Sequence, residues 1–177
     1  LPAVEIEVLG PPPSSGTRDA FEELVMEAGC ETISGANCEN SAHIREDGVY
    51  VDAGENDNLI VSRLEANPQA VGVFGFSFLD QNSDVIQGSL INGVEPTFDA
   101  IADADYPVAR SMYFYIKDAH IGVVPGIAEY AELFVSEDMI GEDGSLLDLG
   151  LIPLPEDELE KTQSNVANRT LLTTQDF

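Results

Sequence analysis

The sequence predicts an α/β protein, in which strands and helices alternate along a chain of 177 residues. Three observations support this fold class. Residues 4–9 alternate apolar and acidic side chains, which is the pattern of a strand with one solvent-exposed face. Residues 70–79, AVGVFGFSFL, form a nearly continuous apolar run that is typical of a buried strand in an α/β sheet. Between them, residues 21–28 carry apolar side chains at helical spacing.

The first half of the chain reads as strand, loop, helix, strand and helix. GPPP at residues 10–13 ends the first strand, and Gly29 stands where the first helix is expected to stop. A short strand is expected at residues 49–51. A helix over residues 59–66 should end at Asn67-Pro68, because the residue before proline is pushed out of the helical region.

The second half continues the alternation. Residues 96–102 suit a short helix, and residues 111–117, SMYFYIK, suit a further strand. Residues 125–136 predict a helix with an apolar face, formed by Ile127, Tyr130, Ala131 and Phe134. A last helix is expected within the charged stretch 156–169.

Composition indicates a globular, strongly acidic protein. Hydrophobic residues make up 44% of the chain, and 33 acidic against 7 basic residues give a formal charge of -26. This charge repels nucleic acids and anionic membrane surfaces, so neither is an expected partner. We expect the acidic side chains to lie on a solvated surface. The sequence contains no apolar run near the roughly 20 residues that span a bilayer and opens directly on AVEIEVLG, so we expect a soluble mature chain or fragment.

The two cysteines leave two alternatives open. Cys30 and Cys38 are close enough in sequence to close a short loop as a disulfide, if the compartment is oxidising. They could equally be two free, partly buried thiols, because spacing does not reveal redox state. They are too few for a zinc site.

The loop SSGTRDAF, residues 14–21, is the clearest candidate for chemistry. Ser and Thr side chains cap helix N-termini well, and Gly16 lets the backbone come close to a ligand. Unpaired N–H groups at the start of a helix suit an oxyanion, so neutral donors could hold an anion even in an acidic protein. The alternative is an ordinary Ser/Thr cap that only fixes the helix entry.

Catalytic and metal sites find little support. The loop matches neither the phosphate-loop nor the serine-nucleophile motif, and the two histidines, His43 and His120, are read as surface or capping residues rather than bases. Acidic clusters at residues 54–58 and 142–148 lack the spacing of a calcium loop. We therefore expect no enzyme activity, no metal and no cofactor.

Several motifs in order resemble the substrate-binding proteins of phosphate ABC transporters. These motifs are GPPPSSGTRDAF, HIREDGVY, GENDNLIVSRL, ANPQAVGVFGFSFL, YPVARSMYFYIK and GLIPLP, and they cover roughly residues 4–155. The resemblance implies a type II periplasmic binding-protein fold, in which two α/β lobes close over inorganic phosphate. It implies phosphate contacts from Ser15, Gly16 and Thr17, with Ser14 as a further candidate.

This chain departs from the family pattern at the loop. Many members carry an arginine four residues before the serine and an aspartate two before it, where this chain has Pro11 and Pro13. Arg45 is therefore our first candidate for the positive charge and Arg18 the second, with a surface salt bridge as the alternative for both.

Two further residues are expected to support the site. Asp57 and Asn58 either orient the phosphate-binding arginine or cap the helix that follows them.

The resemblance extends only to the later part of such a protein. Residues 1–105 would form most of the second lobe, and residues 106–177 the hinge strand and the C-terminal part of an incomplete first lobe. Such a chain should expose apolar faces and associate with itself or another chain.

The implied function is capture of inorganic phosphate outside the cytoplasm, in the periplasm or its equivalent, and delivery to a membrane permease. We expect the chain by itself to bind phosphate weakly or undetectably, because half of the ligand shell would be missing. The alternatives are a phosphoester-processing enzyme or phosphate sensor that uses the same loop, and an interaction module whose acidic surface binds a basic partner.

Overall fold

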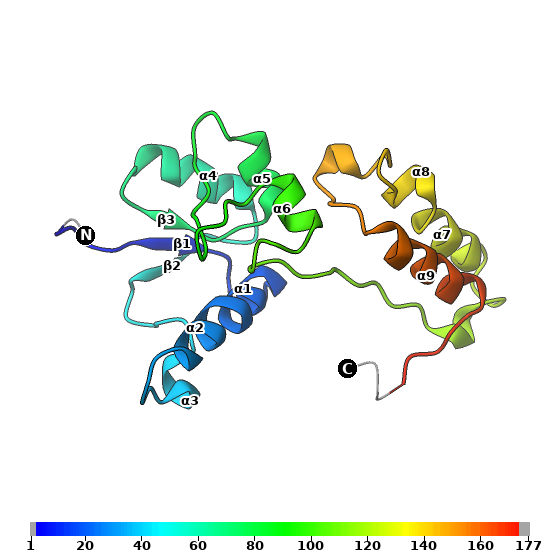
Figure 1. Cartoon of the computed structure of the whole chain (residues 1–177), viewed down its shortest axis with the longest axis horizontal. Helices are drawn as coiled ribbons and strands as arrows, with labels where there is room; N and C mark the ends of the chain where they lie inside the picture. Colours follow the sequence, from blue (N-terminus) through cyan, green and yellow to red (C-terminus); the bar gives the residue numbers. More distant parts are fainter. Residues whose placement is uncertain (1–2, 174–177) are drawn as a thin grey trace. The chain divides into compact units, whose positions relative to one another are not determined.

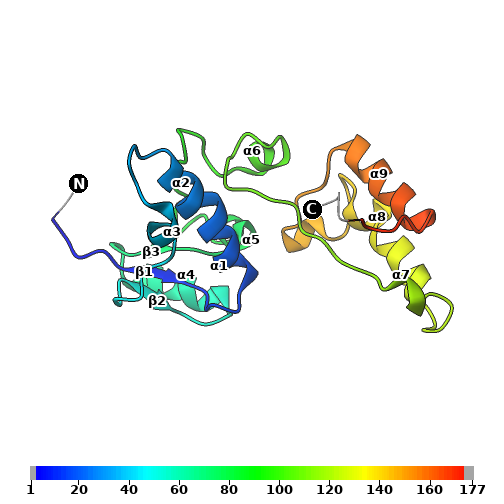
Figure 2. The same cartoon turned by 90° about the horizontal axis from the view of Figure 1, so that it is seen from below.

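A computed structural model describes residues 3–173 and divides the chain into two compact units. The first unit comprises residues 1–100 and 104–110, and the second comprises residues 101–103 and 111–177. Figures 1 and 2 show the first unit in blue to green and the second mainly in yellow to red.

The first unit is built on a small parallel sheet with the strand order β2-β1-β3. The central strand β1 (Val8–Gly10) pairs with β2 (Tyr50–Asp52) and with β3 (Val71–Gly72), and Leu9 stands opposite Val51 on one side and Gly72 on the other. The strand expected at residues 49–51 is confirmed with a shift of one residue, whereas the strand expected at residues 4–9 is confirmed only at Val8 and Leu9, and Gly10 continues it. Parallel pairing with helical connections makes this an α/β unit, as predicted.

The first helix runs further than predicted. The segments α1 (Gly16–Phe21), a π-helical stretch (Glu22–Glu27) and α2 (Ala28–Glu31) follow one another without a break, and Figures 1 and 2 draw them as one helical rod. The expected stop at Gly29 is wrong: this residue has an ordinary helical environment, and the rod ends after Glu31.

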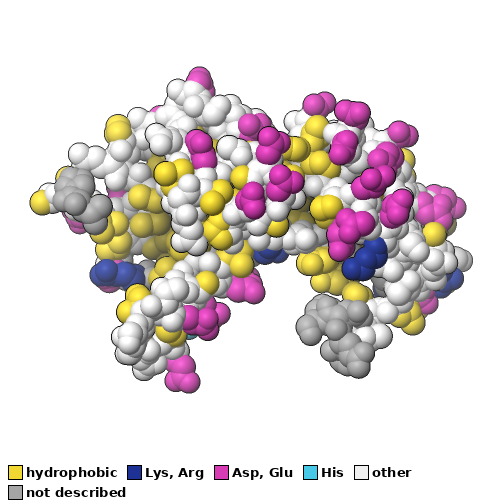
Figure 3. Space-filling view, viewed as in Figure 1, with side chains coloured by type: hydrophobic (Ala, Val, Ile, Leu, Met, Phe, Trp, Pro, Cys, Tyr) yellow, Lys and Arg dark blue, Asp and Glu magenta, His cyan; other side chains and the backbone are white. Residues whose placement is uncertain are grey.

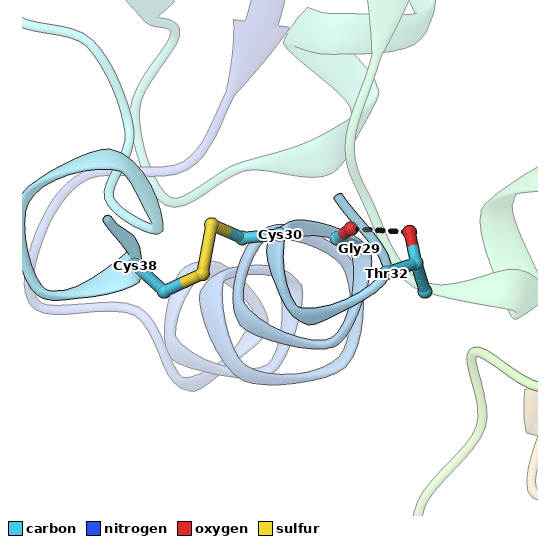
Figure 4. The surroundings of a disulfide bond; sticks show 4 residues. All are labelled: Gly29, Cys30, Thr32 and Cys38. Atoms are coloured by element: carbon cyan, nitrogen blue, oxygen red, sulfur yellow. Dashed lines mark hydrogen bonds between the residues drawn. A yellow bond between two sulfur atoms is a disulfide. The ribbon is translucent and has the colours of Figure 1, made fainter. Parts of the chain in front are cut away.

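The disulfide alternative is confirmed for the two cysteines. Cys30 at the end of the rod is bonded to Cys38, the first residue of α3 (Cys38–Ser41), with 5.8 Å between their Cα atoms. Figure 4 shows this bond beside the hydrogen bond from Thr32 Oγ1 to the Gly29 carbonyl, which measures 2.7 Å. The disulfide thus ties α3 to the last turn of the rod.

The apolar run at residues 70–79 is only partly a strand. Strand β3 covers Val71–Gly72, and the helix α5 (Phe76–Gln81) begins within the same run. Apolar content alone does not distinguish a buried strand from a buried helix, which is why the prediction of one long strand was wrong. The turn between them is held by Asp57, whose Oδ2 accepts a hydrogen bond from Gly75 N–H at 3.3 Å.

The core of the first unit lies against the sheet. Helix α4 (Asp57–Ala66) confirms the helix expected at residues 59–66, and its Ile60 is fully buried beside Leu9 and Ala53. Leu64 and Phe74 pack around this cluster. The short helix α6 (Phe98–Ala102) confirms the helix expected at residues 96–102.

The second unit is helical in its described part. Its elements are a 3-10 turn (Asp118–His120), α7 (Ile127–Phe134), α8 (Glu137–Ile140), a second 3-10 turn (Leu147–Leu149) and α9 (Glu156–Ala167). Helices α7 and α9 confirm the two expected helices. Val135, Ile140 and Leu159 form the core of the unit.

The strand expected at residues 111–117 is wrong as a paired element. These residues run without regular secondary structure and lie beside no strand in the part of the chain that is described. A strand needs a neighbour to receive its backbone hydrogen bonds, and the second unit offers no sheet among its described residues. In residues 3–173, no helix is long and apolar enough to cross a bilayer.

Candidate functional site

The candidate site is the loop between β1 and α1, named the anion loop and defined as residues 14–17. Ser15 N–H donates to the Pro12 carbonyl at 3.0 Å, which turns the chain before the helix. Ser15 is the N-cap of α1: its backbone is extended, and its Oγ accepts a hydrogen bond from Thr17 N–H at 3.2 Å. The expected Ser/Thr cap is therefore present.

Capping leaves several donors of this loop available. Gly16 N–H and the Thr17 hydroxyl make no hydrogen bond to any residue in the described range, and Gly16 is exposed. The Ser15 hydroxyl accepts through its oxygen, so its proton is also unused. Three donors thus lie within three consecutive residues, which is an arrangement that suits an oxyanion.

Ser14 has a different environment. Its hydroxyl donates to Glu55 Oε1 at 2.7 Å, and both side chains are exposed. A carboxylate beside the loop repels a fully ionised anion. Ser14 is thus already engaged, unlike Gly16 and Thr17.

The structure brings an arginine to the anion loop that the sequence analysis missed. Arg110 Nη2 donates to the Gly16 carbonyl at 3.1 Å, across 94 residues of sequence. This side chain is exposed, and no carboxylate in residues 3–173 pairs with it. The signal was present in YPVARS, where Arg110 is the only basic residue, but a contact so distant in sequence cannot be derived from spacing.

Arg18 lies on the rod rather than over the loop. Its guanidinium stands 4.9 Å from the centre of the Tyr50 ring and 3.7 Å from Glu22 Oε1, and only 14% of its side chain is exposed. Burial raises the pKa of the Tyr50 hydroxyl, although the positive charge of Arg18 opposes this shift. Arg18 therefore makes a cation–π contact and an ion pair that stabilise the first unit.

Arg45 lies in an exposed ion pair with Asp47. The hydrogen bond from Arg45 lowers the pKa of the Asp47 carboxyl, and the same contact raises the pKa of Arg45. No contact joins Arg45 to the anion loop in the described part of the chain. Its assignment as the first phosphate arginine stays a prediction, and its observed contact is the surface salt bridge weighed against it.

Pro11 occupies the position at which the family resemblance implies an arginine. Its side chain is fully buried, and its carbonyl accepts a hydrogen bond from the Tyr50 hydroxyl at 2.9 Å. Gly10 lies directly beneath the Tyr50 ring, and an added Cβ would overlap the hydroxyl. Pro11 is therefore part of the core, where burial of an unpaired charged side chain would be costly.

Asp57 and Asn58 do not act as the helix cap. Asn56 is the N-cap of α4, and its Oδ1 accepts hydrogen bonds from both the backbone N–H and the side-chain Nδ2 of Asn58 at 3.1 Å. The prediction that Asp57 or Asn58 caps this helix is therefore wrong, because the cap is the residue before them, Asn56. Among the described residues neither side chain contacts an arginine, and burial raises the pKa of Asp57, which accepts from Gly75 N–H.

The first unit is an α/β unit in which a loop with unused hydrogen-bond donors lies between the first strand and the first helix. The sequence model of the family described as "PBP superfamily domain" matches residues 1–138, and the chain belongs to this family. This confirms the predicted fold class.

The relatives of the chain carry more specific names. The chain is 27% identical over 170 residues to the "Phosphate-binding protein PstS" of Staphylococcus saprophyticus, covering 93% of this chain and 46% of that protein. It is 29% identical over 160 residues to the protein of the same name from Staphylococcus haemolyticus, covering 88% of this chain and 44% of the relative. The chain thus spans about half the length of these curated relatives.

A solved structure supports the same fold. The crystal structure of PstS from Borrelia burgdorferi superposes with a TM-score of 0.56 at 16% identity, covering 87% of this chain and 55% of that one. At this identity the likeness concerns the fold.

Proposed function

We propose that this chain binds inorganic phosphate as part of the solute-binding component of an ABC transporter. The observation that carries the proposal is the similarity to phosphate-binding proteins over 93% of the chain. The anion loop supports it, because Ser15, Gly16 and Thr17 present unused donors at one point. Phosphate is an oxyanion that such donors accommodate.

The proposed mechanism is reversible binding of phosphate, in which no covalent bond forms or breaks. Phosphate oxygens accept hydrogen bonds from Gly16 N–H and from the hydroxyls of Ser15 and Thr17. Arg110 supplies positive charge beside them, in place of the arginine that Pro11 has replaced. Arg45 and Arg18 would contribute only if they left their present partners, Asp47 and Glu22. We infer no enzymatic step, because binding and release need no bond to break.

The domain assignment belongs to this proposal. Residues 1–105 are taken as most of the phosphate-binding second lobe, and residues 106–177 as the hinge and part of the first lobe. The proposed partners are a membrane permease and a second copy of this chain. An extracytoplasmic location is supported by the Cys30–Cys38 disulfide, since disulfides persist in oxidising compartments.

A phosphate titration followed by two-dimensional amide NMR tests the proposal on the chain itself. We expect the Gly16 and Thr17 amide signals to move with phosphate at millimolar concentrations, and not with chloride at equal ionic strength. Weak affinity is expected because a single loop supplies few contacts.

Two variants make this titration specific. Ser15→Ala should abolish the shifts, whereas Ser62→Ala, which changes an exposed serine of α4, should leave them intact. Phosphate-specific shifts that avoid residues 14–17, or none at all, would contradict the proposal.

A further inference from the structure

Tyr50 of β2 contacts the chain on both sides of the anion loop. Before the loop, its hydroxyl donates to the Pro11 carbonyl at 2.9 Å. Burial raises the pKa of this hydroxyl, so it stays protonated at neutral pH and can donate. Directly after the loop, the Arg18 guanidinium lies over the Tyr50 ring, 4.9 Å from its centre. One side chain therefore holds both ends of the segment that carries the proposed phosphate donors.

The sheet fixes the position of Tyr50 itself. Tyr50 stands opposite Val8 of β1, and Val8 N–H donates to the Val49 carbonyl at 2.9 Å. Its half-buried ring lies over Gly10, where a Cβ would overlap the ring and its hydroxyl. The strand pairing and this close packing thus place the ring independently of the loop that follows.

The contact with the Pro11 carbonyl reaches the donors through one turn. The next residue, Pro12, accepts a hydrogen bond from Ser15 N–H at 3.0 Å, and Ser15 Oγ accepts one from Thr17 N–H at 3.2 Å. The prolines at residues 11–13 form a stiff connection, because their rings lock φ. A shift of the Pro11 carbonyl would therefore be passed on to the donors.

The contact with Arg18 holds the other end of the loop. Arg18 N–H donates to the Ser15 carbonyl at 3.1 Å in the first turn of α1. Its mostly buried side chain is attracted to the Tyr50 ring face and lies 3.7 Å from Glu22 Oε1. Arg18 therefore holds the first turn of α1 against β2.

We propose that Tyr50 is a positioning residue for phosphate: its hydroxyl and its ring hold the anion loop in the conformation that presents its donors to one oxyanion. This inference rests on the proposed function, and it gives Tyr50 no contact with the anion itself. A loop that is already ordered loses little further conformational freedom when phosphate binds.

Two variants of Tyr50 separate its two contacts. Tyr50→Phe removes the hydroxyl and keeps the ring beneath Arg18, whereas Tyr50→Leu removes both. The matched control is Tyr106→Phe in the same unit, because Tyr106 is also half-buried and its hydroxyl donates to a backbone carbonyl, that of Ser89, at 3.3 Å. Thermal unfolding checks that each variant is folded at the temperature of the measurements.

Amide relaxation without phosphate measures whether Tyr50 holds the loop. We expect the order parameters of residues 14–17 to be those of rigid backbone in the wild type, about 0.85. They should fall in Tyr50→Phe, fall further in Tyr50→Leu and stay unchanged in Tyr106→Phe. Wild-type order parameters in folded Tyr50→Phe would overturn the proposal, and this variant alone decides if Tyr50→Leu does not fold.

The phosphate titration by amide NMR measures the consequence for binding. Tyr50→Phe should weaken phosphate binding by about fivefold, since the backbone of one further residue has to be ordered on binding. Tyr106→Phe should keep the wild-type affinity. Equal losses in Tyr50→Phe and Tyr106→Phe would overturn the proposal, because a general loss of stability would then explain both.

The two measurements also keep this proposal separate from the proposed function. A wild type without phosphate-specific shifts would contradict the proposed function. The order parameters, which are measured without phosphate, would still decide whether Tyr50 holds the loop.

Discussion

At the scale of single residues, Arg110 shows how a distant side chain can complete a local motif. It reaches the Gly16 carbonyl, while the two arginines expected to contact phosphate are engaged with Glu22 and Asp47. A cation that already lies beside the loop needs no rearrangement to meet an anion there.

We predict that Arg110→Gln weakens phosphate binding by about twofold to fivefold, since an exposed charge contributes up to about 1 kcal/mol. Arg63→Gln on the exposed face of α4 is the matched control and should change affinity little. The amide NMR titration measures both. Equal losses of affinity in Arg63→Gln and Arg110→Gln would show that only net charge matters and would contradict the prediction.

Asp57 gives a pH-dependent prediction. Burial raises the pKa of its carboxyl above the ordinary 3.8, and the Gly75 N–H bond only partly offsets this. The folded chain therefore holds this proton more tightly than the unfolded chain. The contribution of Asp57 to stability is greatest below pH 3.8 and is lost as the pH rises through the raised value.

Asp57→Asn mimics the protonated form and keeps an oxygen for Gly75. We expect the free energy of unfolding of this variant, compared with that of the wild type, to rise between acidic and neutral pH. Urea unfolding at a series of pH values measures the difference. A constant difference across that range would argue against a raised pKa.

At the scale of elements, the contact between β1 and β2 depends on a glycine. The Tyr50 hydroxyl of β2 reaches over Gly10 to the Pro11 carbonyl, so a methyl group at residue 10 has no room. The same contact positions the residues that lead into the anion loop.

We predict that Gly10→Ala destabilises the first unit by about 1–3 kcal/mol through overpacking. Gly29→Ala is the control, because its Cβ would meet no atom within 4 Å in a helix, where alanine is favoured by about 1 kcal/mol. Tyr50→Phe, which removes the nearest colliding atom, should rescue part of the loss. Thermal unfolding compares the variants, and equal melting temperatures for the two glycine variants would refute the steric explanation.

The disulfide stabilises the end of the helical rod. Closing a loop between residues separated by 8 positions removes freedom from the unfolded chain, for which chain-entropy arguments give about 2–3 kcal/mol. We predict a loss of this size for Cys30→Ala, Cys38→Ala. Reductant should lower the melting temperature of the wild type and leave that of the double variant unchanged. A reductant effect on the variant would mean that another cause is at work.

At the scale of the whole molecule, each unit carries its own core, Leu9, Ala53 and Ile60 in one and Val135, Ile140 and Leu159 in the other. Figure 3 shows the acidic side chains on the surface of both units, in keeping with the expected solvated acidic surface. The high charge thus coexists with two apolar clusters that contain no buried charged residue in the described range.

The sequence by itself determined much of the fold. Periodicity located α7, the Asn67-Pro68 breaker gave the end of α4, and the charged stretch 156–169 contained α9, because these signals depend on neighbours close in sequence. The places of β2 and of part of β1 were also predicted. The ordered motifs indicated the family before any contact was known. The helix cap at Ser15 also followed from local chemistry.

Only the tertiary structure decided the rest. It divided the apolar run at residues 70–79 between β3 and α5 and carried the first helix past Gly29. Among the described residues it left 111–117 without a strand partner. It also brought Arg110 to Gly16 and placed Arg45 beside Asp47. These outcomes depend on contacts between residues distant in sequence or on competition between nearby partners, and neither is encoded in local spacing.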